Sequence, residues 1–285
     1  MIAIIVNKKA KNADYLDSYL QSFDESQFTY DLFETDSKDL SSTIKDCVLK
    51  YSIILIGGGD GSIRSAAQVC ANTSIKLGVL PLGTMNHLVK ELGLPQNPKD
   101  LTAAIKSENL IQIDLGEVNG FVFINNSSIG FYPKFAQKRD RYSKFYNKWL
   151  SYIPSFIESF KKHPVFKVRV KSSQLNRSLN TSFLMVSNNI YSLKFPITIT
   201  RDSFNDALLG LYYFKYGKIN FIKILKSLFN NKKNFEILKL SEPLELHFPK
   251  EKNIHISLDG DTLSSKTPLL YKSLPKALNL LMNPS

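Results

Sequence analysis

The chain has 285 residues and a formal net charge of +12, from 37 basic and 25 acidic side chains. This length suits two domains rather than one core, and a hydrophobic content of 43% with 12% aromatic residues excludes a disordered chain. The positive charge indicates an anionic partner (nucleotide, nucleic acid or anionic membrane surface), or else a composition that only aids solubility.

Strands and helices alternate through the first third of the chain. Residues 2–7 form a continuous apolar run, typical of a strand buried on both faces, and they read as a strand rather than a signal peptide. The alternation predicts a mostly parallel sheet with helices on both faces, a three-layer α/β nucleotide domain over residues 1–115. The expected strands are 2–7, 28–33, 51–56 and 76–82, and the expected helices are 13–23 and 37–50.

The pattern changes after about residue 110, where strands follow one another with few helices between them. Residues 166–171 alternate strictly between apolar and basic side chains, which is typical of a half-exposed antiparallel strand. We therefore expect a second, β-rich domain over residues 116–272 with two helical interruptions. No run reaches the 18 apolar residues of a membrane span.

One of these interruptions is rich in lysine, arginine and aromatic residues. Trp149, Phe156 and Phe160 fall on one face of the predicted helix, which Pro154 should kink or restart. An aromatic face flanked by basic residues is typical of a helix that lies on an anionic membrane surface. The alternative is a helix that only packs on the sheet.

Cysteine and histidine usage excludes several classes of site. Cys47 and Cys70 lie in apolar helical contexts, which indicates reduced core residues of a cytoplasmic protein. The four histidines are scattered, and no cysteine or histidine spacing matches a metal site or a hydrolase triad. Nucleic-acid binding would depend on net charge alone, because no recognition motif is present.

A glycine-rich turn, residues 55–64 (LIGGGDGSIR), follows the third expected strand and opens a helix. This arrangement presents backbone N–H groups and the positive end of a helix dipole, which together bind phosphate. Asp60 would repel phosphate unless a cation bridges the two or unless it orients a hydroxyl, so the turn predicts nucleotide phosphates with Mg²⁺. It matches neither the P-loop nor the G-x-G-x-x-G pattern.

A second turn of the same kind, residues 81–88 (PLGTMNHL), follows the next strand. Adjacent parallel strands place both turns at the carboxyl edge of the sheet, where ligands bind in open α/β folds. Two such turns on one edge favour a ligand site over two purely structural turns.

The motifs GGGDGS and PLGTMNHLVKELGLP, in this order, resemble the catalytic domain of the diacylglycerol kinase family of soluble lipid kinases, which includes the sphingosine kinases. The resemblance covers nearly the whole chain, and the proline-Leu-Gly-Thr-x-Asn turn separates it from the NAD kinases and phosphofructokinases. Three further segments take part in the resemblance: IIVNKKAKN near the start, SFNDALLGLYYF, and ISLDGD.

The resemblance implies an ATP-dependent kinase that phosphorylates a lipid hydroxyl at a membrane surface. It implies an α/β domain followed by an antiparallel β-sandwich domain, with the nucleotide between them and the chain end, about 273–285, packed back on the first domain. Asp60 and Asp261 would be catalytic, Asp261 as the general base, and Ser203, Asp206 and Leu208 would bind a metal. The implied ATP-binding residues are Asn7, Lys8, Thr35, Gly57, Gly58, Gly59, Asp60, Gly61, Ser62, Arg64, Gly83, Thr84 and Asn86.

Several positions depart from the family pattern. Asp261 stands where the family has glutamate, Ala207 replaces the glycine after the metal-binding aspartate, and Arg64 replaces a common asparagine. These departures motivate the alternative of a nucleotide- or lipid-binding module without catalysis, and a soluble NAD kinase-like enzyme is the other alternative. The sequence does not fix the acceptor lipid or the oligomeric state, and a homodimer is one possibility.

Overall fold

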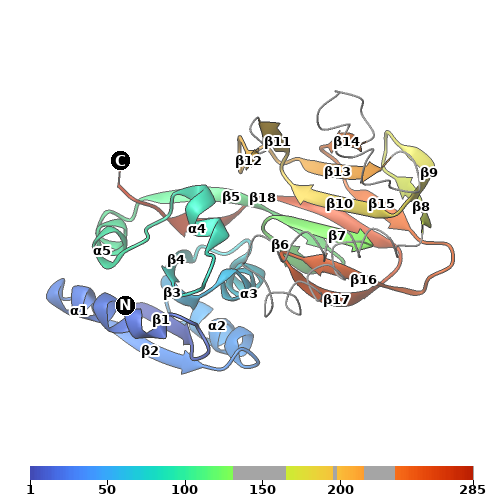
Figure 1. The fold of residues 1–285 in the computed structure, drawn as a ribbon. Coiled ribbons are helices and arrows are strands. Elements are labelled where there is room, and N and C mark those ends of the chain that lie inside the picture. Colours follow the sequence, from blue (N-terminus) through green and yellow to red (C-terminus); the bar gives the residue numbers. More distant parts are fainter. Residues whose placement is uncertain (131–164, 195–197, 215–234, 285) are drawn as a thin grey trace, which may run out of the picture. The chain divides into compact units, whose positions relative to one another are not determined.

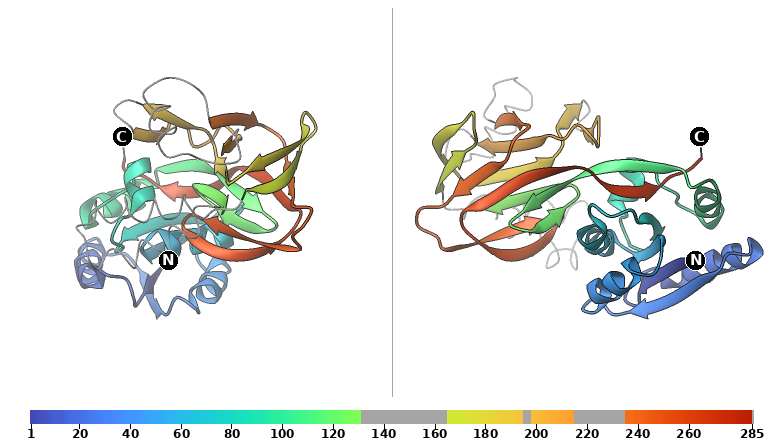
Figure 2. Two further views of the ribbon diagram at one scale, coloured as in Figure 1. Left: turned by 45° about the vertical axis from the view of Figure 1, so that its right-hand side comes forward. Right: turned by 180° about the vertical axis from the view of Figure 1, so that it is seen from behind.

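The computed structural model describes residues 1–130, 165–194, 198–214 and 235–284. The chain divides into two compact units: residues 1–115 with 275–285, and residues 116–274. Two long strands, β5 (Leu110–Val118) and β18 (Leu269–Leu281), each contribute residues to both units (Figures 1 and 2).

The first unit is built on four parallel strands in the order β2-β1-β3-β4 (Figure 1). The end of β18 joins them, because Asn279 and Leu280 pair in parallel with Lys76 and Leu77 of β4. The strands are β1 (Ile2–Asn7), β2 (Tyr30–Thr35), β3 (Ile53–Gly58) and β4 (Lys76–Pro81). The helices are η1 (Ala13–Tyr15), α1 (Leu16–Glu25), α2 (Leu40–Val48), α3 (Asp60–Cys70), α4 (His87–Leu92) and α5 (Pro98–Ser107).

Helices cover both faces of this sheet. On one face, Ile4 and Leu55 share a hydrophobic cluster with Phe23 of α1 and Leu101 of α5. The alternate residues of β1 and β3 point to the opposite face of the sheet. They are buried as well, because α2 and α3 contact the strands on that face. This burial on both faces explains why β1 and β3 read as continuous apolar runs.

The second unit contains a six-stranded antiparallel sheet in the order β14-β13-β10-β7-β16-β17. A second antiparallel set pairs β18 with β15, β15 with β8, and β8 with β9, while β5 pairs with β6. Besides its parts of β5 and β18, the second unit has the strands β6 (Phe121–Phe123), β7 (Asn126–Gly130), β8 (Phe166–Lys171), β9 (Asn176–Thr181), β10 (Phe183–Asn188), β11 (Tyr191–Lys194), β12 (Thr198–Arg201), β13 (Leu209–Phe214), β14 (Phe235–Leu240), β15 (Leu244–His247), β16 (Asn253–Leu258) and β17 (Asp261–Lys266).

One hydrophobic cluster joins the two sets of strands into a sandwich. Ile129 and Leu184 of the six-stranded sheet share it with Val168 of β8 and Tyr271 of β18, and all four are buried. The predicted fold class is therefore confirmed, with a mostly parallel sheet in the N-terminal part and antiparallel sheets in the C-terminal part. The observed bounds of β1 and β8 equal the expected ones, those of the other elements differ by up to three residues, and the expected helix at 13–23 begins with the short η1 turn.

Candidate functional site

The four parallel strands of the first unit end at one edge, and the chain leaves each of them in a polar turn. Asn7 and Thr35 are register partners at the ends of β1 and β2, and Gly58 and Pro81 are partners at the ends of β3 and β4. Parallel pairing therefore brings together segments that lie far apart in the sequence. This edge is where open α/β sheets bind ligands.

The first glycine turn owes part of its composition to internal packing. A Cβ on Gly58 would lie 2.3 Å from the Ser62 hydroxyl oxygen, which no real structure tolerates. Gly59 is different, because its backbone is extended (φ −97°) and a Cβ there would meet only the Cα of Gly83, at an ordinary 3.4 Å. Internal packing thus accounts for glycine at position 58 but not at position 59, where a ligand lying against the backbone would account for it.

Gly59 is also the N-cap residue of α3, which begins at Asp60. Because glycine has no side chain, it gives the first backbone N–H groups of the helix no capping acceptor. The Asp60 and Gly61 N–H groups lie in this first turn, next to the bare backbone of Gly59. The combination provides what an anionic ligand needs at a helix N-terminus.

The second turn is held by two asparagines and packs directly on the first. The Asn86 side chain donates to the Pro81 and Gly83 carbonyls (2.8 and 3.1 Å), and Asn12 also donates to the Gly83 carbonyl (3.0 Å). Asn86 itself is left-handed (φ 48°). A Cβ on Gly83 would lie 2.4 Å from the Cα of Gly59, so the two turns touch through their glycines.

Asp60 links the two turns. One of its carboxylate oxygens accepts a hydrogen bond from the backbone N–H of Leu88 in α4 (3.3 Å), although Asp60 itself opens α3. The Asn86 side-chain oxygen is buried and has no hydrogen-bond partner among the residues that the structure describes. Both oxygens are acceptors, so they would not contact phosphate directly but suit a water or a hard cation that accompanies it.

Polar side chains at the ends of β1 and β2 extend this edge. The Asn7 amide donates to Ser37 (3.1 Å) and lies 3.5 Å from Ser62, and its oxygen accepts from the Lys9 N–H. Thr35 is buried. The other predicted ATP-binding residues lie in the same turns: Lys8, Gly61 and Thr84 are exposed, Arg64 is half-buried on α3, and Gly57 is buried at the end of β3.

The structure thus gathers the sequence-predicted residues of the first unit at one edge. Its groups fit a magnesium–nucleotide, because Gly59 with the start of α3 suits phosphate, and the Asp60 and Asn86 oxygens suit the cation. No group of three or more His, Cys, Asp or Glu side chains with metal-binding geometry occurs in the described parts of the chain.

Asp261 lies in the second unit at the start of β17, and it is exposed. The preceding residues, Asp259 and Gly260, form a two-residue hairpin loop with positive φ (49° and 100°), and Leu258 pairs with Asp261 across it. Aspartate–glycine is the sequence that such a turn favours. The hairpin therefore fixes where the Asp261 backbone lies.

Sequence reasoning missed the role of Asp259. Its carboxylate accepts hydrogen bonds from three successive backbone N–H groups, those of Ile124, Asn125 and Asn126, at 2.7 to 3.0 Å. Arg201 is buried and binds the same segment with donors, to the Ile124 carbonyl (2.9 Å) and the Asn125 side chain (2.7 Å). The Asp-Gly hairpin signal could have drawn attention to Asp259, whereas nothing local marks Arg201.

The predicted metal loop brings two of its three residues into contact. The Ser203 hydroxyl donates to the Asp206 carboxylate (2.7 Å), and the Leu208 carbonyl accepts from the Asn189 N–H (2.8 Å). Ala207, the departure from glycine, has φ 57°, which is the left-handed conformation that glycine adopts most easily. The backbone shape of the loop is therefore the one that the missing glycine would favour.

The membrane-facing candidates Trp149, Phe156 and Phe160 lie outside the described residues. Among the residues that are described, no helix is long and apolar enough to cross a membrane.

The chain is similar to several known proteins. Residues 1–118 match the model of the diacylglycerol kinase catalytic domain. A Staphylococcus haemolyticus protein named "putative lipid kinase" is 26% identical over 242 residues, which cover 81% of this chain and 77% of that protein. A "probable lipid kinase" of Pseudomonas aeruginosa is 38% identical over 86 residues, 30% of this chain and 28% of that one.

The fold is shared with a solved structure of a "putative diacylglycerol kinase" from Bacillus anthracis. The TM-score is 0.75 at 21% identity, over 99% of this chain and 97% of that one. The resemblance predicted from the sequence is confirmed by these matches: residues 1–118 of this chain match the diacylglycerol kinase catalytic-domain model, and the relatives are named as lipid kinases.

Proposed function

We propose that this protein is an ATP-dependent kinase that phosphorylates the hydroxyl of a lipid, diacylglycerol or a related lipid alcohol, with the help of Mg²⁺. The observation that carries the proposal is the pair of polar turns that pack on each other at the carboxyl edge of the parallel sheet. The match of this same unit to a diacylglycerol kinase catalytic domain supports it. The names of the relatives point to the same reaction class.

Phosphoryl transfer requires positioning, neutralisation of charge and an acceptor for the hydroxyl proton. Bound Mg-ATP supplies the phosphoryl group and the cation that offsets its charge. The N–H groups at the start of α3 hold phosphate oxygens, and Gly59 allows their close approach. Asp60 and Asn86 orient the hydrated cation, while Asn7, Lys8, Thr35, Ser62, Arg64 and Thr84 line the nucleotide.

In the second unit, we propose that Asp261 accepts the proton of the lipid hydroxyl. It sits one residue beyond a hairpin turn whose geometry Asp259 anchors, so its backbone has a fixed position. Aspartate is one methylene shorter than the glutamate of the family, and a base must lie within about 3 Å of its proton, or bond to it through one water. A bridging water is one way in which Asp261 can serve.

The loop with Ser203, Asp206 and Leu208 is proposed as a cation site that supports this domain. Asp206 would be its carboxylate ligand, and the Ser203 and Leu208 carbonyls would complete it. We further propose that the protein works in the cytoplasm, peripherally bound to an anionic membrane, and that nucleic acid is not a partner.

A transfer assay tests the proposed reaction. Purified protein is incubated with labelled ATP, Mg²⁺ and a total lipid extract, and the label is followed into the organic phase. Asp60→Asn should abolish transfer while keeping the hydrogen bond to the Leu88 N–H, because an amide oxygen also accepts. Asp100→Asn, at the start of α5, is the matched control and should transfer like the native protein.

The same assay separates the alternatives. Loss of transfer in Asp261→Ala, with ATP binding unchanged, supports the assignment of the base. ATP binding without transfer to any lipid would favour a non-catalytic binding module, and transfer to NAD would favour the NAD kinase-like alternative.

A further inference from the structure

The outer face of β8 in the second unit is basic. Val168 and Val170 are buried in the sandwich, whereas Lys167, Arg169 and Lys171 point the opposite way and are exposed. On the next strand, His247 is the register partner of Arg169 and is also exposed. The exposed polar face therefore continues from β8 to the end of β15, and Figure 1 shows these strands side by side.

Beyond β15 the chain turns through a lysine-rich segment and enters β16. Lys250 and Lys252 lie in this turn, and Lys266 of β17 is paired across the hairpin with Asn253. We call the six cationic side chains on β8, in this turn and at the end of β17 the basic surface. Its members are Lys167, Arg169, Lys171, Lys250, Lys252 and Lys266.

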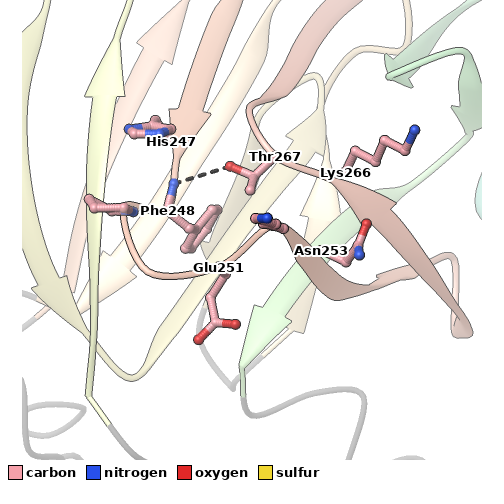
Figure 3. Close-up of a pocket in the computed structure, with 8 residues that line it drawn as sticks. His247, Phe248, Glu251, Asn253, Lys266 and Thr267 are labelled. Carbon is pink, nitrogen blue, oxygen red and sulfur yellow. Dashed lines mark hydrogen bonds between the residues drawn. The ribbon is translucent and has the colours of Figure 1, made fainter.

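An open pocket of about 490 Å³ lies in this turn, and Figure 3 shows its lining. His247, Lys252, Asn253, Lys266 and Thr267 supply its polar groups, and Glu251 is its acidic residue. The pocket therefore offers cationic and amide donors around one concave space.

The floor of the pocket is well supported. The Phe248 N–H donates to the Thr267 hydroxyl (3.2 Å), and the Thr267 N–H donates to the Lys252 carbonyl (3.1 Å). Phe248 is buried, and its ring lies 5.7 Å from that of Phe166 in β8. These contacts tie the turn to the hydrophobic core, so the folded structure of the unit maintains the pocket.

The basic surface carries more positive than negative charge. Among the residues that the structure describes, none of its six members forms an ion pair. Glu245 on β15, the register partner of Lys171, and Glu251 in the turn are the acidic residues of these two segments, against six cations. An exposed cluster with a net positive charge of this kind attracts an extended anionic partner.

We propose that the basic surface docks the protein on an anionic phospholipid bilayer, and that the pocket beside it takes a lipid headgroup phosphate. The proposal rests on the proposed function, since a kinase of membrane lipids must reach its acceptor at a bilayer. Leu270, on β18 next to Glu245 of β15, is 49% exposed and offers an apolar side chain to the lipid. None of its residues belongs to the aromatic segment around Trp149, which lies outside the described residues.

A nucleic acid is the competing partner for a basic surface. Single strands bind on platforms of exposed aromatic side chains, and the strand beyond β8 offers Asn176, Ser178 and Asn180 instead. The exposed side chains therefore favour the bilayer.

Vesicle sedimentation tests the proposal, with phosphatidylcholine vesicles made with and without phosphatidylglycerol. Each lysine near an anionic surface contributes about five-fold to partitioning. The triple variant K167Q/K252Q/K266Q should therefore lose on the order of 100-fold in binding to the anionic vesicles. The control K45Q/K50Q/K99Q removes the same charge from exposed lysines of the first unit and should lose much less.

Equal losses in the two triple variants, or no loss in the first, would overturn the proposal. So would displacement of the native protein from the vesicles by a DNA oligonucleotide at equal phosphate concentration. Transfer to a short-chain soluble diacylglycerol is measured alongside, and it should be unchanged in K167Q/K252Q/K266Q. If no variant, nor the native protein, shows transfer but vesicle binding still depends on the basic surface, the proposed function fails and the docking surface stands.

Discussion

The contact between Gly59 and Gly83 predicts opposite outcomes for two alanine substitutions. In Gly83→Ala, the new Cβ would lie 2.4 Å from the Cα of Gly59 and 2.6 Å from the Asn86 side-chain oxygen. Both contacts are too short, and one of them is with backbone, so the two turns must separate. Overpacking of this kind costs about 1–3 kcal/mol, which lowers the melting temperature by several degrees.

In Gly59→Ala, the new Cβ meets only an ordinary contact of 3.4 Å, and the backbone is already extended. The folded protein should tolerate it, with a change in stability within about 1 kcal/mol, because alanine is a weaker N-cap but a less flexible residue. A methyl group at the start of α3 would, however, occupy space against which we place phosphate. ATP affinity should therefore fall at least about ten-fold, or about 1.4 kcal/mol.

Calorimetric titration with Mg-ATP and thermal unfolding of the full chain measure the two quantities separately. Gly59→Ala should lose ATP binding with little loss of stability, and Gly83→Ala should lose both. A Gly59→Ala protein that binds ATP as tightly as the native one would refute the placement of the phosphates at this turn. A Gly83→Ala protein of native stability would refute the conclusion that Gly59 and Gly83 pack too closely for a side chain at position 83.

Three further predictions concern stability. Ala207→Gly should stabilise the second unit by about 0.5–1 kcal/mol in denaturant unfolding. Glycine removes the cost of a left-handed alanine (φ 57°), about 1–2 kcal/mol, but part of this gain is lost because glycine gives the unfolded chain more conformational entropy. A lower denaturation midpoint would contradict this prediction. Asp259→Ala should lower the free energy of unfolding by about 2–4 kcal/mol, because three backbone N–H groups lose a charged acceptor. Asp202→Ala, which removes an exposed carboxylate, is the comparison and should lower it far less. Burial raises the pKa of Tyr19 from 10.0 to about 12, so the stability that its neutral form contributes is complete below pH 10.0 and is lost as the pH rises toward 12. In Tyr19→Phe, the free energy of unfolding should fall less between pH 10 and pH 12 than in the native protein. An equal fall in the two proteins would assign the loss to other groups.

The parallel sheet could be predicted because its sequence signal is local. β1 and β3 are buried on both faces, so they appear as continuous apolar runs, and the helices between them show helical spacing. Strand ends were less accurate. Gly57 and Gly58 continue β3 beyond the expected end at 56 because their partners on β4 provide hydrogen bonds, and a strand's last pairings depend on its neighbour rather than on its own residues.

The polar residues of the first unit could be found from the sequence for the same reason. Asp60 and Asn86 lie in turns that follow predicted strands, and the carboxyl ends of neighbouring parallel strands meet at one edge of a sheet. The reason for the glycines could not be found in this way. Gly58 and Gly83 are required by contacts with Ser62 and Gly59, and a sequence does not show which of its glycines touch one another.

Ala207 shows how a departure from a motif can leave its geometry intact. In the sequence alone, alanine in place of glycine counts against the metal loop, because glycine is the residue that adopts positive φ at least cost. In the fold, the Leu208 N–H donates to the Asn189 side chain (3.2 Å), and the Asn189 N–H donates to the Leu208 carbonyl (2.8 Å). This pair of bonds holds both backbone polar groups of Leu208, the residue after Ala207. Two such bonds contribute about 1–3 kcal/mol, enough to offset a left-handed alanine at about 1–2 kcal/mol. The substitution therefore bears on the stability of the loop more than on its shape, and Asp206 keeps the backbone setting that a glycine would have given it.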